Sequence, residues 1–418
     1  MNRLVLIGNG FDLAHKLPTS YQDFINWYWC QKIYLAATKP DIDCNDLLCK
    51  MTPPTGESWF STVFNDTTLK NYLDDGKGIV IFNYLQNNKK IVLELSPFFE
   101  RIHKSIENKG WVDIENDYYE LLKKYVLEDE DETKVKELND QLHFIQDKLI
   151  EYLALATKKE VKPIEGIDFA IYGGFRPVDI AIARTDAIID HVEGEMALSD
   201  KEWKYKLKCC GFVEYSKYFK AIREFRNSHK GALSEKDLFL CPFVYYYPNH
   251  IMILNFNYTN IAELYNRTIE IADTKAKIPI NYIHGTLDKP ESVIFGYGDE
   301  MDEKYKEIVK KNDNQFLGNI KSIKYLEDDN YRNVLDFIES EPYQIIIMGH
   351  SCGNSDRTLL NTLFEHRNCV SIKPYYHKKE DGTDNYLELV QNISRNFTDM
   401  KLMRDRVVNK TYCEPLKK

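Results

Sequence analysis

The sequence has little of what marks several common protein classes. Its 418 residues include 19 Gly and 14 Pro without a glycine period or a low-complexity tract, which excludes collagen-like and disordered chains. No apolar run approaches the roughly 18 residues that span a bilayer. The short apolar run near the N-terminus leads into a glycine turn and not into a cleavage site for a signal peptide. We therefore expect no membrane association and a cytoplasmic location.

Excess basic charge is also missing. Lys and Arg total 55 against 65 Asp and Glu, a formal net charge of -10. Nucleic-acid-binding surfaces need surplus cations to release counterions, so the composition does not indicate a nucleic acid partner. The nine Cys are scattered without a CxxC pair, which favours buried thiols over zinc ligands or disulfides. Without an HExxH motif, paired Asp motifs or a Walker A sequence, we predict no metal and no ATP-driven work.

Several apolar runs end in small or polar residues. Continuous runs of β-favouring residues are typical of strands in a parallel sheet that is covered on both faces. The clearest are residues 4–7, 251–254, 279–283 and 344–348. Helical patterns alternate with them, so we predict an α/β fold with a doubly wound, Rossmann-like parallel sheet. Residues 293–295 are expected to form a further strand.

The region between residues 38 and 244 lacks this alternation and is predicted to be a large, mainly helical insertion. The sheet domain would then be discontinuous, formed by residues 1–37 plus 245–418. Apolar residues recur every three to four positions from Val135 to Leu153, which predicts a helical hairpin over 111–157. The apolar stripe of that hairpin is a surface through which a homodimer would form.

The residues that follow four of these strands form the candidate site. In open parallel sheets, ligands bind beyond the carboxyl ends of the strands. The four segments are 8–10, 255–257, 284–285 and 349–351. Gly8 and Gly10 would let a phosphate approach the backbone, and Asp12 suits a ribose hydroxyl or a helix cap. Leu13 occupies the third small position of the G-x-G-x-x-G fingerprint, which argues against a standard dehydrogenase. We predict a nucleotide ligand.

These residues resemble a known family. The run from Gly8 to Ala14, continuing through Leu17-Pro18-Thr19-Ser20-Tyr21, resembles the opening motif of the AbiH abortive-infection proteins of bacteria. Shorter matches follow in the same order, namely Trp111 to Glu115, Phe256-Asn257-Tyr258-Thr259, Ile283-His284-Gly285, and Gly349-His350-Ser351 with Asp356. The resemblance implies an anti-phage role and a phage-derived trigger.

A more distant resemblance is to sirtuins and sirtuin-like NADases. The positions that match are Gly8, Gly10, Pro18, Asn257, His284 and Gly285. This resemblance implies a sirtuin-like sheet with NAD+ as ligand or substrate, Asn257 orienting a water or the ribose, and His284 as general base. Thr259 and Asp12 replace an Asp and a Ser of that family, so the cofactor and catalysis itself stay open.

Glu115 is the third candidate catalytic residue. It precedes a predicted helix, where a carboxylate favours the helix dipole, or it reaches the pocket as a second acid or base. The full set of predicted ligand contacts is Gly8, Asn9, Gly10, Phe11, Asp12, Thr19, Asn257, Tyr258, Gly285, Gly349, His350, Ser351 and Asp356.

Other functions remain as alternatives. Gly349-His350-Ser351-Cys352-Gly353 fits the G-x-S-x-G nucleophile elbow of serine hydrolases, although Asp356 is too close in sequence to reach around a His. Cys352 with His350 would be a thiol variant. The sheet would otherwise hold a nucleotide without turning it over, as a sensor or interaction module. A toxin directed at nucleic acid is, like the serine hydrolase, a less favoured alternative.

Overall fold

The computed structural model describes residues 1–39, 44–52, 66–88, 91–109, 113–209, 216–267, 269–271, 274–276 and 278–417. The chain forms two compact units. The first comprises Met1–Lys16, Glu160–Val293 and Tyr325–Lys418, and the second Leu17–Lys159 and Ile294–Lys324. The boundaries of these units differ from the predicted division into 1–37 plus 245–418 and 38–244, which stays a prediction.

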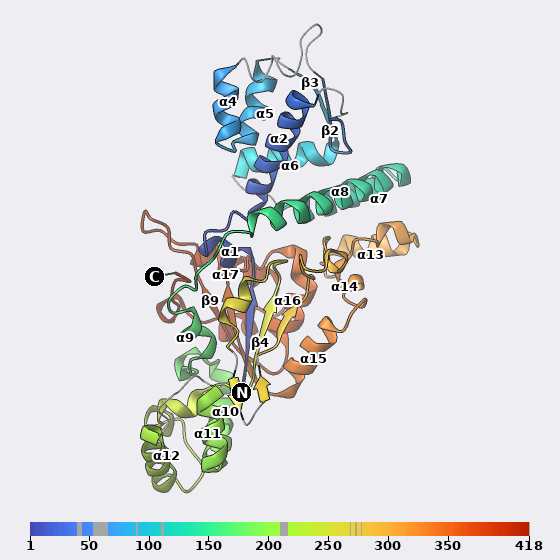
Figure 1. Cartoon of the computed structure of the whole chain (residues 1–418). Coiled ribbons are helices and arrows are strands. Elements are labelled where there is room, and N and C mark those ends of the chain that lie inside the picture. Colours follow the sequence, from blue (N-terminus) through green and yellow to red (C-terminus); the bar gives the residue numbers. More distant parts are fainter. Residues whose placement is uncertain are drawn as a thin grey trace. The chain divides into compact units, whose positions relative to one another are not determined.

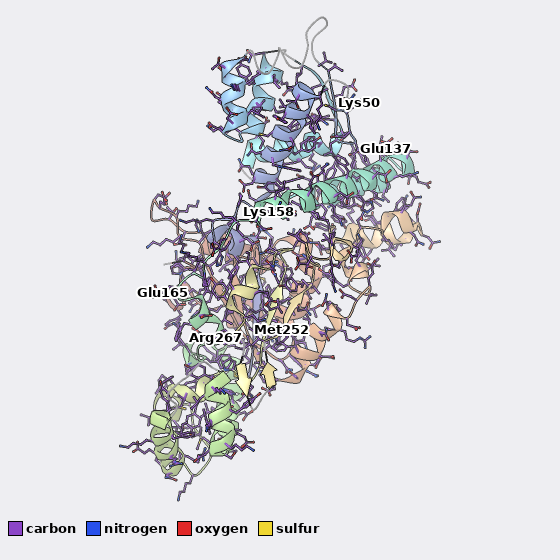
Figure 2. All side chains as sticks on the ribbon, in the orientation of Figure 1. Lys50, Glu137, Lys158, Glu165, Met252 and Arg267 are labelled. Atoms are coloured by element: carbon purple, nitrogen blue, oxygen red, sulfur yellow. The ribbon has the colours of Figure 1, made fainter. Side chains whose placement is uncertain are left out.

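The first unit is built around a five-stranded sheet (Figure 1). The strands lie in the order β7–β4–β1–β8–β9, and each neighbouring pair is parallel. They are β1 (Asn2–Ile7), β4 (Ile251–Asn255), β7 (Ile280–Tyr282), β8 (Tyr343–Met348) and β9 (Cys369–Tyr375). Every residue of β1 and β8 is buried, as their continuous apolar runs predict for the middle of a parallel sheet. Met252 of β4 lies among densely packed side chains around the sheet (Figure 2). The predicted α/β class and parallel sheet are confirmed.

Helices and short turns accompany the sheet. The α-helices are α1 (Asn9–Ala14), α9 (Ile167–Tyr172), α10 (Thr185–Ala197), α11 (Asp200–Cys209), α12 (Ser216–Ser228), α15 (Asn330–Ser340), α16 (Arg357–Glu365), α17 (Tyr386–Arg395) and α18 (Met400–Arg406). The 3-10 turns are η1 (Pro177–Asp179), η2 (Ile182–Arg184), η3 (Asp237–Phe239), η4 (Phe243–Tyr246), η5 (Ile261–Tyr265), η6 (Pro290–Ser292), η8 (Asn354–Asp356) and η9 (Lys410–Tyr412). A two-stranded sheet pairs β5 (Ile269–Ile271) with β6 (Thr274–Ala276). Helix α15 packs beside β7, and α16, α17 and α18 pack beside β9.

The second unit is mainly helical. Its helices are α2 (Tyr21–Thr38), α4 (Thr67–Asp74), α5 (Gly78–Asn87), α6 (Pro97–Lys109), α7 (Ile114–Leu127), α8 (Glu132–Ala156), α13 (Glu303–Lys310), η7 (Asn314–Phe316) and α14 (Lys321–Lys324). Strands β2 (Cys49–Thr52) and β3 (Val92–Leu95) pair antiparallel. Helices α7 and α8 span most of the range predicted as a hairpin, and Asp113 and Asp131 cap their N-termini. Trp111 lies outside the described residues.

One predicted strand is wrong. The described residues 293–295 do not pair with the sheet. The next residues enter the second unit, where Gly296 N–H donates to Glu115 and Tyr297 N–H donates to Asn319 O at 3.0 Å. A three-residue apolar run does not by itself distinguish a strand from another buried segment. Among the described residues, none of the helices is long and apolar enough to span a bilayer.

Candidate functional site

The structure brings the four strand-end segments together in the first unit. Asn257 Nδ2 donates to Gly8 O at 3.0 Å, which ties the end of β4 to the end of β1. Gly10 N–H donates to Gly349 O at 2.8 Å, which ties β1 to β8. His284 Nδ1 lies 3.2 Å from Phe256 O, which ties β7 to β4. Because the strands are parallel, their carboxyl ends share one edge, and this edge is the candidate site.

The glycines of this edge allow two turns to touch. A Cβ on Gly8 would lie 2.5 Å from His350 Cα, and a Cβ on Gly349 would lie 2.1 Å from Phe11 N. Gly349 also has φ +73°, a conformation that side chains disfavour. Two amides of the β1 turn already donate within the protein, Gly10 to Gly349 O and Phe11 to Gly8 O, both at 2.8 Å. The glycines therefore serve close packing of the backbone here, whatever else they do.

A buried carboxylate lies directly behind the β1 turn. Asp12 is 1% exposed, and its two oxygens accept from Thr259 Oγ1 at 2.7 Å and from Asn257 Nδ2 at 3.0 Å. Burial raises the pKa of Asp12 to about 6, and the two hydrogen bonds offset only part of that effect. Within the described part of the chain, Asp12 has no cationic partner. A carboxyl group that is half ionised near pH 6 can hold or release a proton at physiological pH.

The loop after β4 is arranged by its own side chains. Asn255 Nδ2 donates to Thr259 O at 3.0 Å, and Asn255 Oδ1 accepts from Asn257 N–H at 3.0 Å. These bonds hold Asn257 and Thr259 against Asp12. Sequence reasoning placed Asn255 in a strand-end segment of the site without a ligand contact, and considered Thr259 only through the family resemblance.

Asp356 lies between two histidines. Its Oδ1 is 3.2 Å from His284 Nε2, and its Oδ2 is 3.5 Å from His350 Nε2. His350 Nδ1 accepts from Cys352 N–H at 3.0 Å, so in the neutral ring the proton is on Nε2 and faces Asp356. All three side chains are buried. The arrangement is a carboxylate that orients two imidazoles, as in catalytic acid–base groups.

The neighbours of His284 determine where its protons lie. Phe256 O can only accept, so the 3.2 Å bond requires a proton on Nδ1. Nε2 faces Asp356 and also lies 3.1 Å from Tyr325 Oη. Of these two partners, an ionised Asp356 can only accept, whereas the Tyr325 hydroxyl can donate or accept. The His284 ring stacks on that of Tyr325, with centroids 6.1 Å apart and planes inclined by 9°. Sequence reasoning missed Tyr325, which follows no recognisable motif.

The remaining predicted contacts are scattered over the edge. Phe11 is buried against His15 and Tyr265, with ring centroids at 4.7 and 5.5 Å. Tyr258 is half-buried, 6.5 Å from the His284 ring. Gly285 has φ +78° and faces Ser292 O. Asn9 and Ser351 are exposed.

Glu115 and Thr19 belong to the second unit, and their contact with the ligand stays a prediction. Glu115 is buried, and its carboxylate lies 2.9 Å from Lys321 Nζ and accepts from Gly296 N–H at 3.2 Å. Lys321 is 1% exposed. Thr19 is buried, and its amide donates to Leu17 O at 3.0 Å. Glu115 thus forms an ion pair within its own unit, and a catalytic role for it stays a prediction.

The serine hydrolase alternative lacks its supporting geometry. Positive φ angles occur at Gly349 and Cys352, whereas a nucleophile elbow strains the serine itself. Asp356 contacts His284 and His350, and His366 pairs with Glu339 at 3.1 Å. Burial raises the pKa of the Cys352 thiol far above its usual range, so Cys352 stays protonated.

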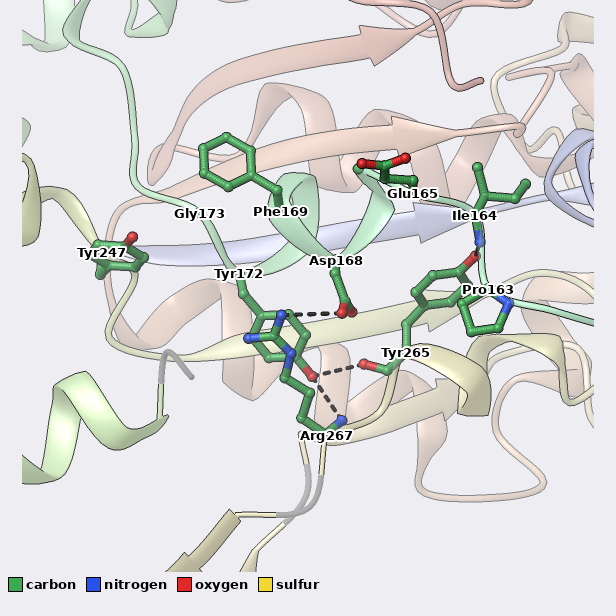
Figure 3. Close-up of a pocket in the computed structure, with 11 residues that line it drawn as sticks. Pro163, Ile164, Glu165, Asp168, Phe169, Tyr172, Gly173, Tyr247, Tyr265 and Arg267 are labelled. Atoms are coloured by element: carbon green, nitrogen blue, oxygen red, sulfur yellow. Dashed lines mark hydrogen bonds and ion pairs between the residues drawn. The ribbon is translucent and has the colours of Figure 1, made fainter. Parts of the chain in front are cut away.

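A separate cavity of about 440 Å³ opens beside α9 (Figure 3). Arg267 crosses it, with its guanidinium 4.3 Å from the Tyr172 ring centroid and 3.1 Å from Asp168. Tyr172 Oη in turn donates to Tyr265 O at 2.9 Å. The described residues hold no group of three His, Cys, Asp or Glu placed to bind a metal ion.

Comparison with known proteins gives one match. A family model described as bacteriophage abortive infection AbiH matches residues 4–169 and 179–377, which is most of the chain. Neither the curated proteins nor the solved structures contain a significant match.

Proposed function

Because the chain belongs to the AbiH family, whose description implies a role in bacteriophage abortive infection, we propose that it acts by binding NAD+ or a related nucleotide and hydrolysing it. Loss of a central cofactor would stop the infected cell before phage mature. The proposal also includes a cytoplasmic location and activation by a phage-derived trigger. The protein would form a homodimer through its helical region.

The strand order supports a nucleotide as ligand. Numbered along the chain, the order β7–β4–β1–β8–β9 reads 3-2-1-4-5, which matches the first five strands of doubly wound dinucleotide-binding sheets. In such sheets the strand order reverses between strands 1 and 4, and ligands bind in the crevice there. The equivalent pair is β1 and β8, where Gly10 and Gly349 meet. Two of the turn amides donate internally. We therefore assign the ribose end of the ligand to the polar side chains of this edge, His284, Asp356 and Asn257.

The proposed reaction uses this edge as an acid–base site. Water attacks the anomeric carbon of the nicotinamide ribose, the C–N bond breaks, nicotinamide leaves as a neutral molecule, and a base takes the proton of the water. In its neutral form His284 would be that base, taking the proton of the water on Nε2, and the ionised Asp356 would steady the imidazolium that results. Asn257 offers a donor and an acceptor for a ribose hydroxyl.

One observation carries the proposal: Asp12, His284, His350 and Asp356 are all buried at the carboxyl edge of one parallel sheet. Buried ionisable groups cost stability, and a structural role alone would be met more cheaply by apolar residues. Their accumulation at the edge where ligands bind therefore favours chemistry over architecture.

The test is whether the purified full-length protein consumes NAD+, measured as the release of nicotinamide. His284→Ala is expected to slow the reaction about 10²- to 10⁴-fold, the usual contribution of a general base. His377→Ala removes an exposed His and is the matched control, expected to behave as the unmodified protein. Thermal unfolding of each variant verifies its fold.

A non-catalytic nucleotide sensor is the second candidate. It is favoured by the closed contacts of the site, since His284 Nε2 already faces Asp356 and Tyr325. NAD+ that binds but is never consumed, with and without extract of phage-infected cells, would establish the sensor and refute hydrolysis.

A further inference from the structure

One face of the sheet carries a polar stripe. Arg3 of β1 is in register with Gln344 of β8, which pairs with Ser371 of β9, and Lys373 lies two residues further along β9 on the same face. All four are buried, from 0% to 5% exposed. Faces of parallel sheets are normally apolar, and buried polar groups cost free energy unless they are paired. The stripe therefore requires an explanation.

A helix end accounts for the first half of the stripe. The Arg3 guanidinium donates to the carbonyls of Ala170, Ile171 and Gly173, which end α9, with 3.1 Å to Ile171 O. It also donates to Gln344 Oε1 at 3.1 Å. A cation at the carboxyl end of a helix offsets the helix dipole.

The second half is a closed ring of ion pairs. Lys373 Nζ lies 3.1 Å from Asp179 and 3.0 Å from Glu414, while Arg176 lies 2.8 Å from Asp179 and 3.0 Å from Glu414. Asp179 and Lys373 are buried, whereas about a third of the Glu414 side chain is exposed. The ring borders a cavity of about 180 Å³, which Arg3 and Tyr375 also line. Glu414 is thus the outer anion of an otherwise buried cluster.

Glu414 belongs to a segment that lies along the edge of β9. Leu416 N–H donates to Tyr376 O at 2.8 Å, and Arg176 donates to Tyr412 O at 2.8 Å. The fit is imperfect. Glu414 Oε2 is 3.0 Å from Lys373 Nζ but lacks hydrogen-bond geometry, and within the described chain Arg176 Nε is buried without a hydrogen-bond partner.

We propose that this cavity binds the phosphate group of a small molecule and that Glu414 occupies the site as an internal substitute. With Glu414 withdrawn, Arg3, Arg176 and Lys373 face Asp179 alone, which leaves two uncompensated positive charges. Exposed Glu165 at the rim is screened by water. A phosphate monoester carries between one and two negative charges at pH 7, and Arg and Lys are its usual partners. Its three oxygens reach donors that one carboxylate leaves unused.

The proposed site adjoins the candidate catalytic edge. Met348 lines the cavity and directly precedes Gly349 in the β8 turn. An anion bound in the cavity would thus lie beside Met348, the residue before Gly349, whose carbonyl accepts from Gly10 N–H. The site does not depend on NAD+ hydrolysis, so either proposal can fail alone.

The test is calorimetric titration of the full-length protein with inorganic phosphate, with acetate as the comparison anion. Glu414→Gln removes the internal substitute and is expected to tighten phosphate binding about tenfold or more, because one unit charge a few ångströms away is lost. Glu380→Gln, at an exposed residue, is the matched control and leaves the affinity unchanged. Arg176→Gln in the Glu414→Gln background is expected to abolish the gain.

Hydrogen exchange at the Leu416 amide gives a second readout that needs no variant. Phosphate, but not acetate at equal ionic strength, should speed its exchange in the unmodified protein by releasing the segment from Tyr376. Equal phosphate affinity in the Glu414→Gln and unmodified proteins would overturn the proposal. So would unchanged Leu416 exchange, or a gain in phosphate affinity from Glu414→Gln that persists when Arg176→Gln is added.

Discussion

Replacing Asp12 by Asn should change how stability depends on pH. The side chain keeps its shape, and its amide can accept from Asn257 Nδ2 and donate to Thr259 Oγ1, which preserves both hydrogen bonds of the carboxylate. What the substitution removes is a negative charge that burial makes costly. Any effect therefore reports ionisation of Asp12 and not loss of packing.

The magnitude follows from the pKa. Burial raises the pKa of Asp12 from 3.8 to about 6, and one unit corresponds to ~1.4 kcal/mol. Below pH 3.8 the carboxyl is protonated in both the folded and unfolded states and costs nothing. Above pH 6 it is ionised in both, and the folded protein bears the full cost of about 3 kcal/mol. Stability of the unmodified protein should thus fall with rising pH through this window, relative to Asp12→Asn.

Scanning calorimetry from pH 4.5 to 8 measures the effect. About 2 kcal/mol of the difference lies in that range, and at ~2–4 °C per kcal/mol the Tm of Asp12→Asn should gain roughly 4–8 °C on that of the unmodified protein. Asp336→Asn, on an exposed position of α15, is the control and should give a parallel profile. Parallel profiles for Asp12→Asn as well would refute the raised pKa and with it the argument that a costly charge is retained for function.

Two further substitutions test contacts on either unit. Gly349→Ala should destabilise the protein by about 3 kcal/mol or more in urea unfolding, because a Cβ would lie 2.1 Å from a backbone nitrogen. The control Gly382→Ala, with φ +85° and open space around it, should cost only about 1–2 kcal/mol. Equal losses for the two variants would contradict the close contact of the two turns. Lys321→Met should cost about 3–5 kcal/mol by leaving Glu115 ionised and buried, and adding Glu115→Gln should restore much of it. Additive losses in the double variant would show that the ion pair does not hold that unit together.

The sequence predicts the sheet better than the site. The strand of residues 4–7 is evident because a continuous apolar run suits the middle of a parallel sheet, and the polar residues after each strand mark the shared edge. Register and partners are not local properties. The pairings of His284 with Asp356 and of Glu115 with Lys321 join residues 72 and 206 positions apart, and no periodicity encodes them. The contact of Tyr325 with His284 could not be predicted for the same reason, since it depends only on where the chain returns to the edge.

The central strand of the sheet, β1, is synthesised first, but its second neighbour is synthesised late. β1 pairs with β4 on one side and with β8 on the other, and its second partner begins at Tyr343. At about 5–20 residues per second, a ribosome needs roughly 17–70 s to travel between them. Both edges of β1 lack a partner until β4 is made, and the edge that faces β8 lacks one for the whole interval, when the carboxyl end of β1 has neither His350 nor Asp356 beside it. A nascent or prematurely terminated chain therefore carries no assembled site, so a protein whose activity harms its own host would become dangerous only once translation has passed the whole sheet.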